Sequence, residues 1–257
     1  MQALTLPARH GWRWLADGFR LFRKNHGMLA FLVVSYWLLM AVLNLIPWLG
    51  TAVTTLCIPA FSVSLMNACR NIERAAPLSP QILFSGFQSN LPALLTLGAV
   101  YLVATLCILG ISSLADDGVL LRLMMAGEKP TPEAIADGRF VLASQIALLL
   151  LCPLMMAYWY APMLAAWHRF SPGKALFFSF VACLRNWRAF LVYSLAVAFV
   201  CMLAPVFLLG LLAVLLQESS ALVSGLVVVG TILVIAPTVF ASFYVSFRDV
   251  FVTGSDA

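Results

Sequence analysis

Few residues in this chain have the type and spacing needed for catalytic or metal-binding chemistry. The three histidines, His10, His26 and His168, stand singly, without the HxxxH or HExxH spacing that puts two imidazoles on one helical face. The six cysteines form no CxxC pair, which argues against a metal centre or a disulfide framework. No Ser, His and Asp set can be proposed. We therefore expect a non-enzymatic protein with no metal site and no cofactor.

Basic and aromatic residues carry the clearest chemical signal. Residues 9–26 place Arg13, Arg20 and Lys24 on one face of an amphipathic helix and Trp12 and Phe19 on another. Residues 167–188 have a similar composition. Such segments lie in the headgroup plane of a membrane, where each Lys or Arg contributes roughly 1 kcal/mol of attraction to anionic lipid. We predict that seven basic residues converge and bind anionic headgroups: Arg20, Arg23, Lys24, Arg169, Lys174, Arg185 and Arg188. The alternative is that they only anchor and orient the helices.

The elements that position these residues are membrane spans. Hydrophobic residues make up 63% of the chain and charged residues 10%, against roughly 45–50% and 25% in soluble domains. Six apolar runs contain no Asp, Glu, Lys or Arg, and crossing a bilayer takes roughly 20 helical residues. We predict an all-α polytopic membrane protein, a single domain over residues 1–257, with cytoplasmic interfacial helices between its spans. The spans are expected at about 28–49, 51–67, 91–114, 140–165, 189–216 and 221–247.

The distribution of charge predicts the orientation. Twelve of the fifteen Lys and Arg residues lie in the N-terminal segment, the connections after the second and fourth spans, and the tail, and only Arg122, Lys129 and Arg139 lie on the other side. Because short cytoplasmic loops are enriched in Lys and Arg, both termini are expected in the cytoplasm and the protein in the bacterial inner membrane. Topology accounts for the basic residues, so no nucleic-acid partner is expected.

A threefold repeat is expected within the chain. The pattern F-x2-[F/C]-x2-N precedes each odd-numbered span and ends at Asn25, Asn90 and Asn186, where we expect the chain to turn into the bilayer. Each even-numbered span contains a proline expected to kink it, because proline removes a helical hydrogen bond. These prolines are Pro59, Pro162 and Pro237. The pattern predicts three parallel repeats at about 9–74, 78–169 and 170–250. Two of the interfacial helices begin with Ser-Pro, at Ser79 and Ser171, and each serine is expected to cap its helix.

Several segments carry a family resemblance. They are Gly11-Trp12-Arg13-Trp14 to Phe22, Trp159-Tyr160-Ala161-Pro162-Met163-Leu164, Ser171-Pro172 through Ala175, Ser179, and Asn186-Trp187-Arg188. With these segments the chain resembles a family of uncharacterised bacterial six-span inner-membrane proteins. It is more distantly similar to the membrane domain associated with glycerophosphoryl diester phosphodiesterases. That relative has a soluble catalytic domain with no counterpart in these 257 residues, so we expect no phosphodiesterase activity. Mitochondrial carriers are also similar in plan, but they place their prolines on odd-numbered spans within an acid-and-base motif.

Two classes of function are consistent with these features. The first is a non-enzymatic accessory or lipid-interacting membrane protein, which the basic cytoplasmic face and the uncharged spans favour. The second is a small-molecule or lipid transporter that uses a cavity between the helices, which three span prolines would favour. A packed apolar centre beside a basic groove would indicate the first class, and a continuous polar cavity at mid-membrane would indicate the second.

Overall fold

The computed structural model describes residues 3–46, 49–203, 205–207, 209–211 and 221–251, and of residues 221–224, 226 and 227 the backbone alone. The described residues form helices and no strand, as predicted. Before the fourth span the helices are α1 (His10–Lys24), α2 (His26–Asn44), α3 (Leu49–Glu73), the 3-10 helix η1 (Pro80–Gln88), α4 (Leu91–Asp116), α5 (Val119–Ala126) and α6 (Pro132–Ala136). From there on they are α7 (Arg139–Tyr158), α8 (Ala161–Trp167), α9 (Pro172–Arg185), α10 (Trp187–Ala198), the π-helical turn η2 (Phe199–Leu203) and α12 (Ala221–Val250).

Six segments of the described chain are long and apolar enough to cross a membrane. They are His26–Asn44, Leu49–Glu73, Leu91–Asp116, Arg139–Trp167, Trp187–Leu211 and Val228–Val250. Each overlaps one predicted span. The second continues six residues past its predicted end at 67, because its last turns are buried against other helices and need no lipid. The predicted end of the fifth span at 216 lies outside the described residues.

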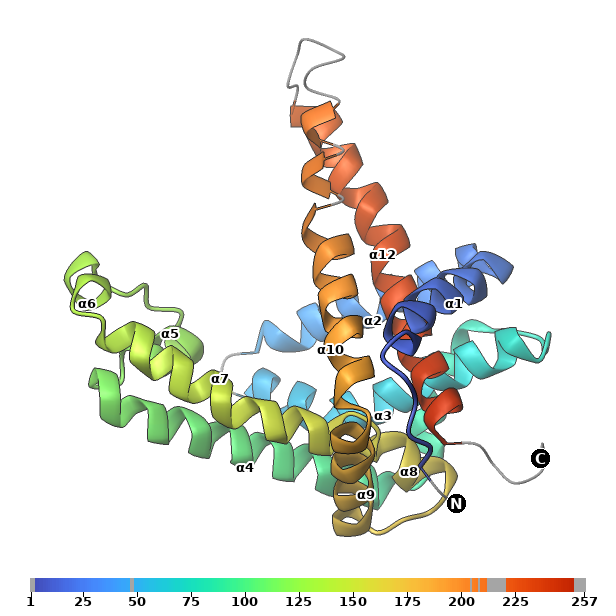
Figure 1. Ribbon diagram of the computed structural model, residues 1–257, viewed down its shortest axis with the longest axis horizontal. Helices are drawn as coiled ribbons and strands as arrows, with labels where there is room; N and C mark the ends of the chain where they lie inside the picture. The colour runs from blue at the N-terminus through green and yellow to red at the C-terminus, as the bar shows by residue number, and fades with distance from the viewer. Residues whose placement is uncertain (1–2, 47–48, 204, 208, 212–220, 252–257) are drawn as a thin grey trace.

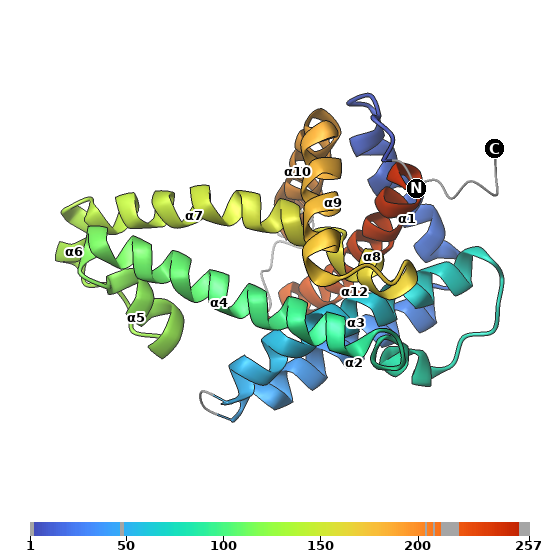
Figure 2. The same cartoon turned by 90° about the horizontal axis from the view of Figure 1, so that it is seen from below.

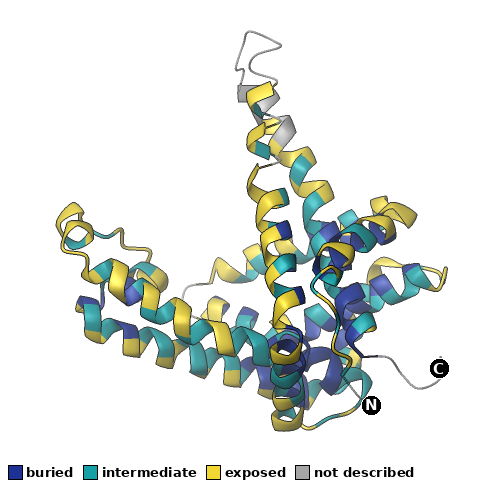
Figure 3. Cartoon of the chain, in the orientation of Figure 1, coloured by how far each residue is buried: buried dark blue, intermediate teal, exposed yellow. Residues whose placement is uncertain are grey.

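Three hairpins leave one shared core in three directions. In Figure 1 the α4/α7 pair extends to the left and the α10/α12 pair extends upward, while the α2/α3 pair recedes behind them. Figure 2 shows α2 and α3 leaving toward the lower left, apart from α4 and α7. Burial follows this plan, since the dark blue residues of Figure 3 gather where the hairpins meet and the far ends of the pairs are mostly exposed. Many of the exposed side chains along the spanning helices are large and apolar, as expected for helices whose solvent is lipid.

The ends of three spans meet around Trp167 in the shared core. Its indole Nε1 donates a hydrogen bond to Asn67 Oδ1 of α3 at 2.9 Å. The Arg70 guanidinium lies 5.3 Å from the centre of the same indole, and the ring of Phe247 on α12 lies edge-on to it with the ring centres 5.1 Å apart. Residues from α3, α8 and α12 therefore form one mixed aromatic and polar junction.

The helix that precedes each hairpin packs on another hairpin's second span. The 3-10 helix η1 lies against α3, where the Gly86 amide donates to Ser64 Oγ at 2.9 Å. Similarly, α9 packs against α7 and α8, and α1 packs against α12. A Cβ added to Gly18 of α1 would lie 2.6 Å from Ser242 Cβ of α12. Ser64 and Ser242 each follow a span proline by five residues. The threefold repeat itself stays a prediction, which superposition of the three units would test.

The positions singled out by the repeat have different local structures. Asn25 separates α1 from α2, Asn90 precedes α4, and Asn186 separates α9 from α10. Pro59 and Pro237 lie within the unbroken helices α3 and α12. Pro162 is instead the second residue of α8, just after the break at Trp159 and Tyr160 in the fourth span. All three prolines are buried.

The two serine caps predicted from the Ser-Pro pairs were wrong. Neither Ser79 nor Ser171 makes a side-chain cap hydrogen bond, although each is in extended geometry and is followed by proline in the first helical turn. The fixed φ of proline already favours the first helical turn, so each of these two helices can start without a hydroxyl cap. By contrast, Thr131 does cap α6, accepting from the Ala134 amide at 3.3 Å.

Candidate functional site

The basic helix α1 is held in place by a face that carries no charge. Gly11, Trp14 and Gly18 are buried at helical spacing, with Gly11 against the backbone of Ala189 on α10 and Gly18 against α12. The Trp14 ring lies 5.9 Å from the ring of Tyr193. The sequence pattern identified a charged face and an aromatic face but not this third one. This uncharged face packs against the two spans and so determines which side of α1 remains open.

A groove of about 430 Å³ lies between α1 and the third hairpin, where residues of η2 and α12 line it. From α1 it is lined by Trp12, Leu15, Ala16, Phe19, Arg20 and Arg23, and from the spans by Val200, Val234, Ile235 and Thr238. Trp12 is 55% exposed and Phe19 is 42% exposed, so the aromatic face of α1 forms one open side of the groove. The other walls are aliphatic. The groove is thus apolar along its length, with two arginines from the last two turns of α1.

The two arginines keep hydrogen-bonding capacity for a ligand. Arg20 Nη1 donates to Asp17 Oδ1 at 2.6 Å, which occupies one of the five guanidinium N–H donors. That pair is exposed, and such pairs contribute only about 0–1 kcal/mol, so it competes weakly with another anion. Arg23 is exposed and makes no ion pair or side-chain hydrogen bond among the described residues. A forked guanidinium beside an apolar channel suits a ligand with an anionic head and a hydrocarbon body.

The predicted basic residues come from two segments of the chain, and their convergence stays a prediction. Arg20 and Arg23 line the groove, and Lys24 ends α1. The other four lie along residues 169–188 and make contacts of their own. Arg169 has φ of +52° in the connection before α9, and Lys174 Nζ lies 4.3 Å from the Phe170 ring centre. Arg185 Nε donates to Thr5 Oγ1 at 3.2 Å, and the Arg188 guanidinium lies 5.4 Å from the Trp187 ring centre.

The N-terminal segment was not anticipated as part of the site. Asn186 Oδ1 accepts from the Leu6 amide and its Nδ2 donates to the Leu4 carbonyl, both at 2.8 Å. The Leu4 amide in turn donates to the Val250 carbonyl at the end of α12, at 2.9 Å. These bonds tie the residues ahead of α1 to the ends of α9 and α12. The asparagine expected only to mark a turn therefore also positions the start of the basic helix.

One acidic residue that the sequence argument left unused joins two spans. Glu73, at the end of α3, forms an ion pair with Arg248 of α12 and accepts a hydrogen bond from the Tyr244 hydroxyl at 2.5 Å. Arg248 also pairs with Asp249 at 2.9 Å. The sequence assigned Arg248 a role in topology alone. In the structure it links α12 of the third hairpin to α3 of the first hairpin.

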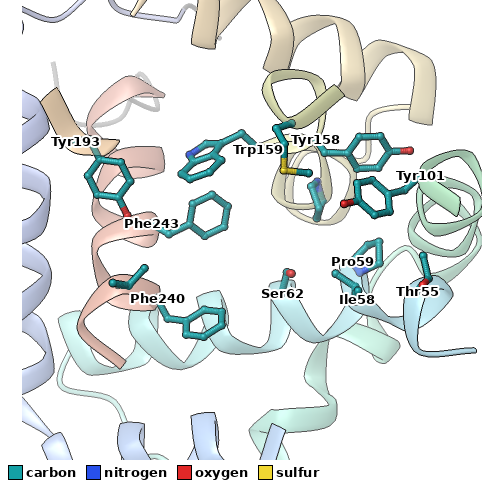
Figure 4. Close-up of a pocket in the computed structure, with 13 residues that line it drawn as sticks. Thr55, Ile58, Pro59, Ser62, Tyr101, Tyr158, Trp159, Tyr193, Phe240 and Phe243 are labelled. Atoms are coloured by element: carbon teal, nitrogen blue, oxygen red, sulfur yellow. The ribbon is translucent and has the colours of Figure 1, made fainter. Parts of the chain in front are cut away.

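A second hollow lies between the hairpins. It has a volume of about 320 Å³ and is lined by residues of α3, α4, α7, α8, α10 and α12, so each hairpin contributes to its wall. Figure 4 shows its aromatic side chains around Ser62, which points into the space from α3. Pro59 and Pro162 line it as well. The wall contains no charged residue.

Metal chemistry has no visible site in the described part of the chain, where no three His, Cys, Asp or Glu side chains gather. Burial raises the pKa of the Cys183 thiol to about 12, which keeps this cysteine of α9 protonated and unreactive at neutral pH.

Comparison with known proteins gives one informative match. No family model and no solved structure matches the chain. A probable inner membrane protein of Burkholderia thailandensis is 37% identical over 257 residues, an alignment that covers 98% of this chain and 94% of that protein. With this similarity over nearly the whole length, and with six apolar helices in the structure, the chain belongs to the family of that probable inner membrane protein and is an integral, multi-pass inner-membrane protein.

Proposed function

We propose that this protein is a non-enzymatic, lipid-interacting accessory protein of the inner membrane that holds anionic lipid at its basic face. The observation that carries the proposal is the groove beside α1. It joins Arg20 and Arg23 to a channel whose remaining walls are almost entirely apolar. A phospholipid has the same two-part chemistry, with a phosphate to pair with guanidinium and an acyl chain to lie along Val234 and Ile235.

The energetics of the groove support a lipid over a soluble anion. Each Lys or Arg near an anionic membrane surface contributes roughly 1 kcal/mol, and an acyl chain adds roughly 0.8 kcal/mol for each CH₂ group that it buries. A soluble anion would gain only the first contribution. The exposed aromatic side chains of Trp12 and Phe19 also favour the headgroup region, where amphipathic rings collect.

The transporter alternative has less support. A pathway for polar solutes needs polar groups along a cavity at mid-membrane. The hollow between the hairpins is instead lined by Tyr, Trp, Phe and aliphatic side chains, with Ser62 and Thr55 as its small polar residues. Such a wall suits apolar material, so we favour the lipid-interacting class over small-molecule transport.

The proposed orientation puts both termini in the cytoplasm and the α1 groove on the cytoplasmic side of the membrane. It rests on the twelve of fifteen Lys and Arg residues that share one side. The test is the reactivity of single cysteines with a membrane-impermeant maleimide in intact spheroplasts. A cysteine replacing Lys129 should react and one replacing Arg74 should not. The reverse pattern would invert the proposed orientation and move the groove to the outer face.

The lipid function itself is tested by native mass spectrometry of the protein extracted with its lipids. Replacing Arg20, Arg23, Arg185 and Arg188 together with Gln should weaken retention of anionic lipid by about 4 kcal/mol, because exposed charges act additively at roughly 1 kcal/mol each. Single replacements should change little. Thermal unfolding of the fourfold variant controls for loss of fold. If a folded fourfold variant kept the parent's anionic lipids, the basic face would be a topology signal only.

A further inference from the structure

The hollow between the three hairpins is distinct from the α1 groove and has its own chemistry. Its volume of about 320 Å³ falls at the lower end of the roughly 300–1,000 Å³ of small-molecule sites. Tyr101, Tyr158, Trp159, Tyr193, Phe240 and Phe243 contribute rings to its wall. Figure 4 shows these rings on both sides of the space above Ser62. A cavity with such a wall excludes ions and sugars, since nothing would replace their hydration.

The tyrosine hydroxyls of this wall have partners of their own. Tyr158 Oη donates to the Leu97 carbonyl at 2.6 Å, and Tyr193 Oη lies 2.8 Å from Ser242 Oγ. Because these polar groups are already paired, the wall offers a ligand mainly apolar surface. Such a surface suits a hydrocarbon chain.

The hollow opens to the lipid. Ile58, one of its wall residues, is 38% exposed and lies within the spanning segment Leu49–Glu73. The surroundings of that opening in the membrane are acyl chains. A hydrocarbon chain can therefore enter sideways without crossing water, and the aromatic wall offers it close contact.

We propose that the hollow between the hairpins binds one acyl chain of a membrane phospholipid. The chain lies among the rings of all three hairpins and fills the centre of the protein. This site needs no anionic headgroup, so it is independent of the proposed function at α1.

The test uses zwitterionic phosphatidylcholine with a photoreactive diazirine on one acyl chain, incorporated with the purified protein into nanodiscs. After illumination, peptide mapping should find the lipid on Met155, Phe240 or Phe243. Replacing Ser62 with Phe should reduce labelling of these residues by about tenfold, because the larger ring occupies the hollow. Labelling of Leu149, which is 74% exposed on α7 and outside the hollow, serves as the internal control and should not change.

A second variant keeps the proposal testable if Ser62→Phe does not fold. Ile58→Trp places a larger side chain at the opening of the hollow and should reduce labelling of the wall residues several-fold, because less of the acyl chain can enter. The matched control is Leu38→Trp, which enlarges a 62% exposed side chain of α2 outside the hollow and should have no effect. Absence of wall labelling in the parent, or equal wall labelling in the parent and in a folded Ser62→Phe or Ile58→Trp variant, would overturn the proposal.

Discussion

The hydroxyl of Tyr193 on α10 lies 2.8 Å from the hydroxyl of Ser242 on α12, directly where α1 crosses the two spans. Ser242 Oγ donates to the Val239 carbonyl at 2.7 Å, so it accepts from the tyrosine. Both residues are buried. This hydrogen bond joins the two spans of the third hairpin beneath the helix that carries the groove arginines. The geometry of the proposed lipid site thus depends on a polar contact within the apolar core.

We expect Tyr193 and Ser242 to be energetically coupled. Tyr193→Phe and Ser242→Ala should each destabilise the protein. The double variant should be less destabilised than the sum of the two by about 0.5–1.5 kcal/mol, the net worth of such a bond. Equilibrium unfolding in mixed micelles measures the free energies of unfolding for this cycle. Strict additivity would mean that the two hydroxyls stabilise the protein through other partners.

Gly18 should tolerate no side chain. A Cβ at this position would lie 2.6 Å from the backbone nitrogen of Ser242, which cannot move aside as a flexible side chain can. Gly18→Ala should therefore lower the free energy of unfolding by about 1–3 kcal/mol, despite the better helix propensity of alanine. Gly27→Ala is the control, because open space surrounds Gly27 near the start of α2. Thermal unfolding followed by size-exclusion chromatography compares the two. Equal melting temperatures would show that α1 is not packed on α12.

Ser179 should contribute more to the free energy of unfolding than its small side chain suggests. Its hydroxyl accepts from the Tyr160 amide at 2.9 Å and donates to the Met156 carbonyl at 2.8 Å, which satisfies both sides of the break between α7 and α8. Ser179→Ala leaves two buried backbone groups unpaired and should destabilise the protein by about 1–3 kcal/mol. Ser144→Ala removes only a bond to Phe140 of its own helix and should cost far less. Equal effects in thermal unfolding would contradict the bridging role.

The pKa of His168 should lie below the ordinary value for histidine. Burial is the first cause that lowers its pKa below 6.5, and the positive charge of Arg70 is the second. The unfolded chain then binds more protons than the folded protein at pH values just below 6.5. The contribution to stability is fully present above pH 6.5 and is lost as the pH falls through the lowered pKa. Carbon-13 NMR of the imidazole ring gives the midpoint directly. A midpoint at or above 6.5 would contradict the buried position.

The sequence was sufficient for the spans and the interfacial helices because both depend on local composition. Six uncharged runs in the sequence overlap the six apolar spans of the structure. The helical spacing of charged and aromatic residues predicted α1 to within two residues at each end. The same pattern could not identify what α1 packs against. Two glycines seven residues apart, Gly11 and Gly18, were the available signal for a close helix contact.

The contacts that build the candidate site join residues far apart in the chain. Asn186 binds the backbone of Leu4 and Leu6, about 180 residues away, and Glu73 pairs with Arg248 across 175 residues. No periodicity encodes such partners. For the same reason the sequence could not show whether the basic residues of the two segments converge, and that convergence stays a prediction.

The most direct test of the central claim compares two double variants of α1 that lose equal charge. Arg20→Gln/Arg23→Gln removes the two arginines that line the groove, and Arg9→Gln/Arg13→Gln removes two exposed arginines that do not. Native mass spectrometry would count the anionic phospholipids retained at matched collision energy. We expect the groove variant to lose anionic lipid by about tenfold or more and the control to remain near the parent. Equal retention in the two variants would contradict a lipid site in the groove and leave only a general surface charge.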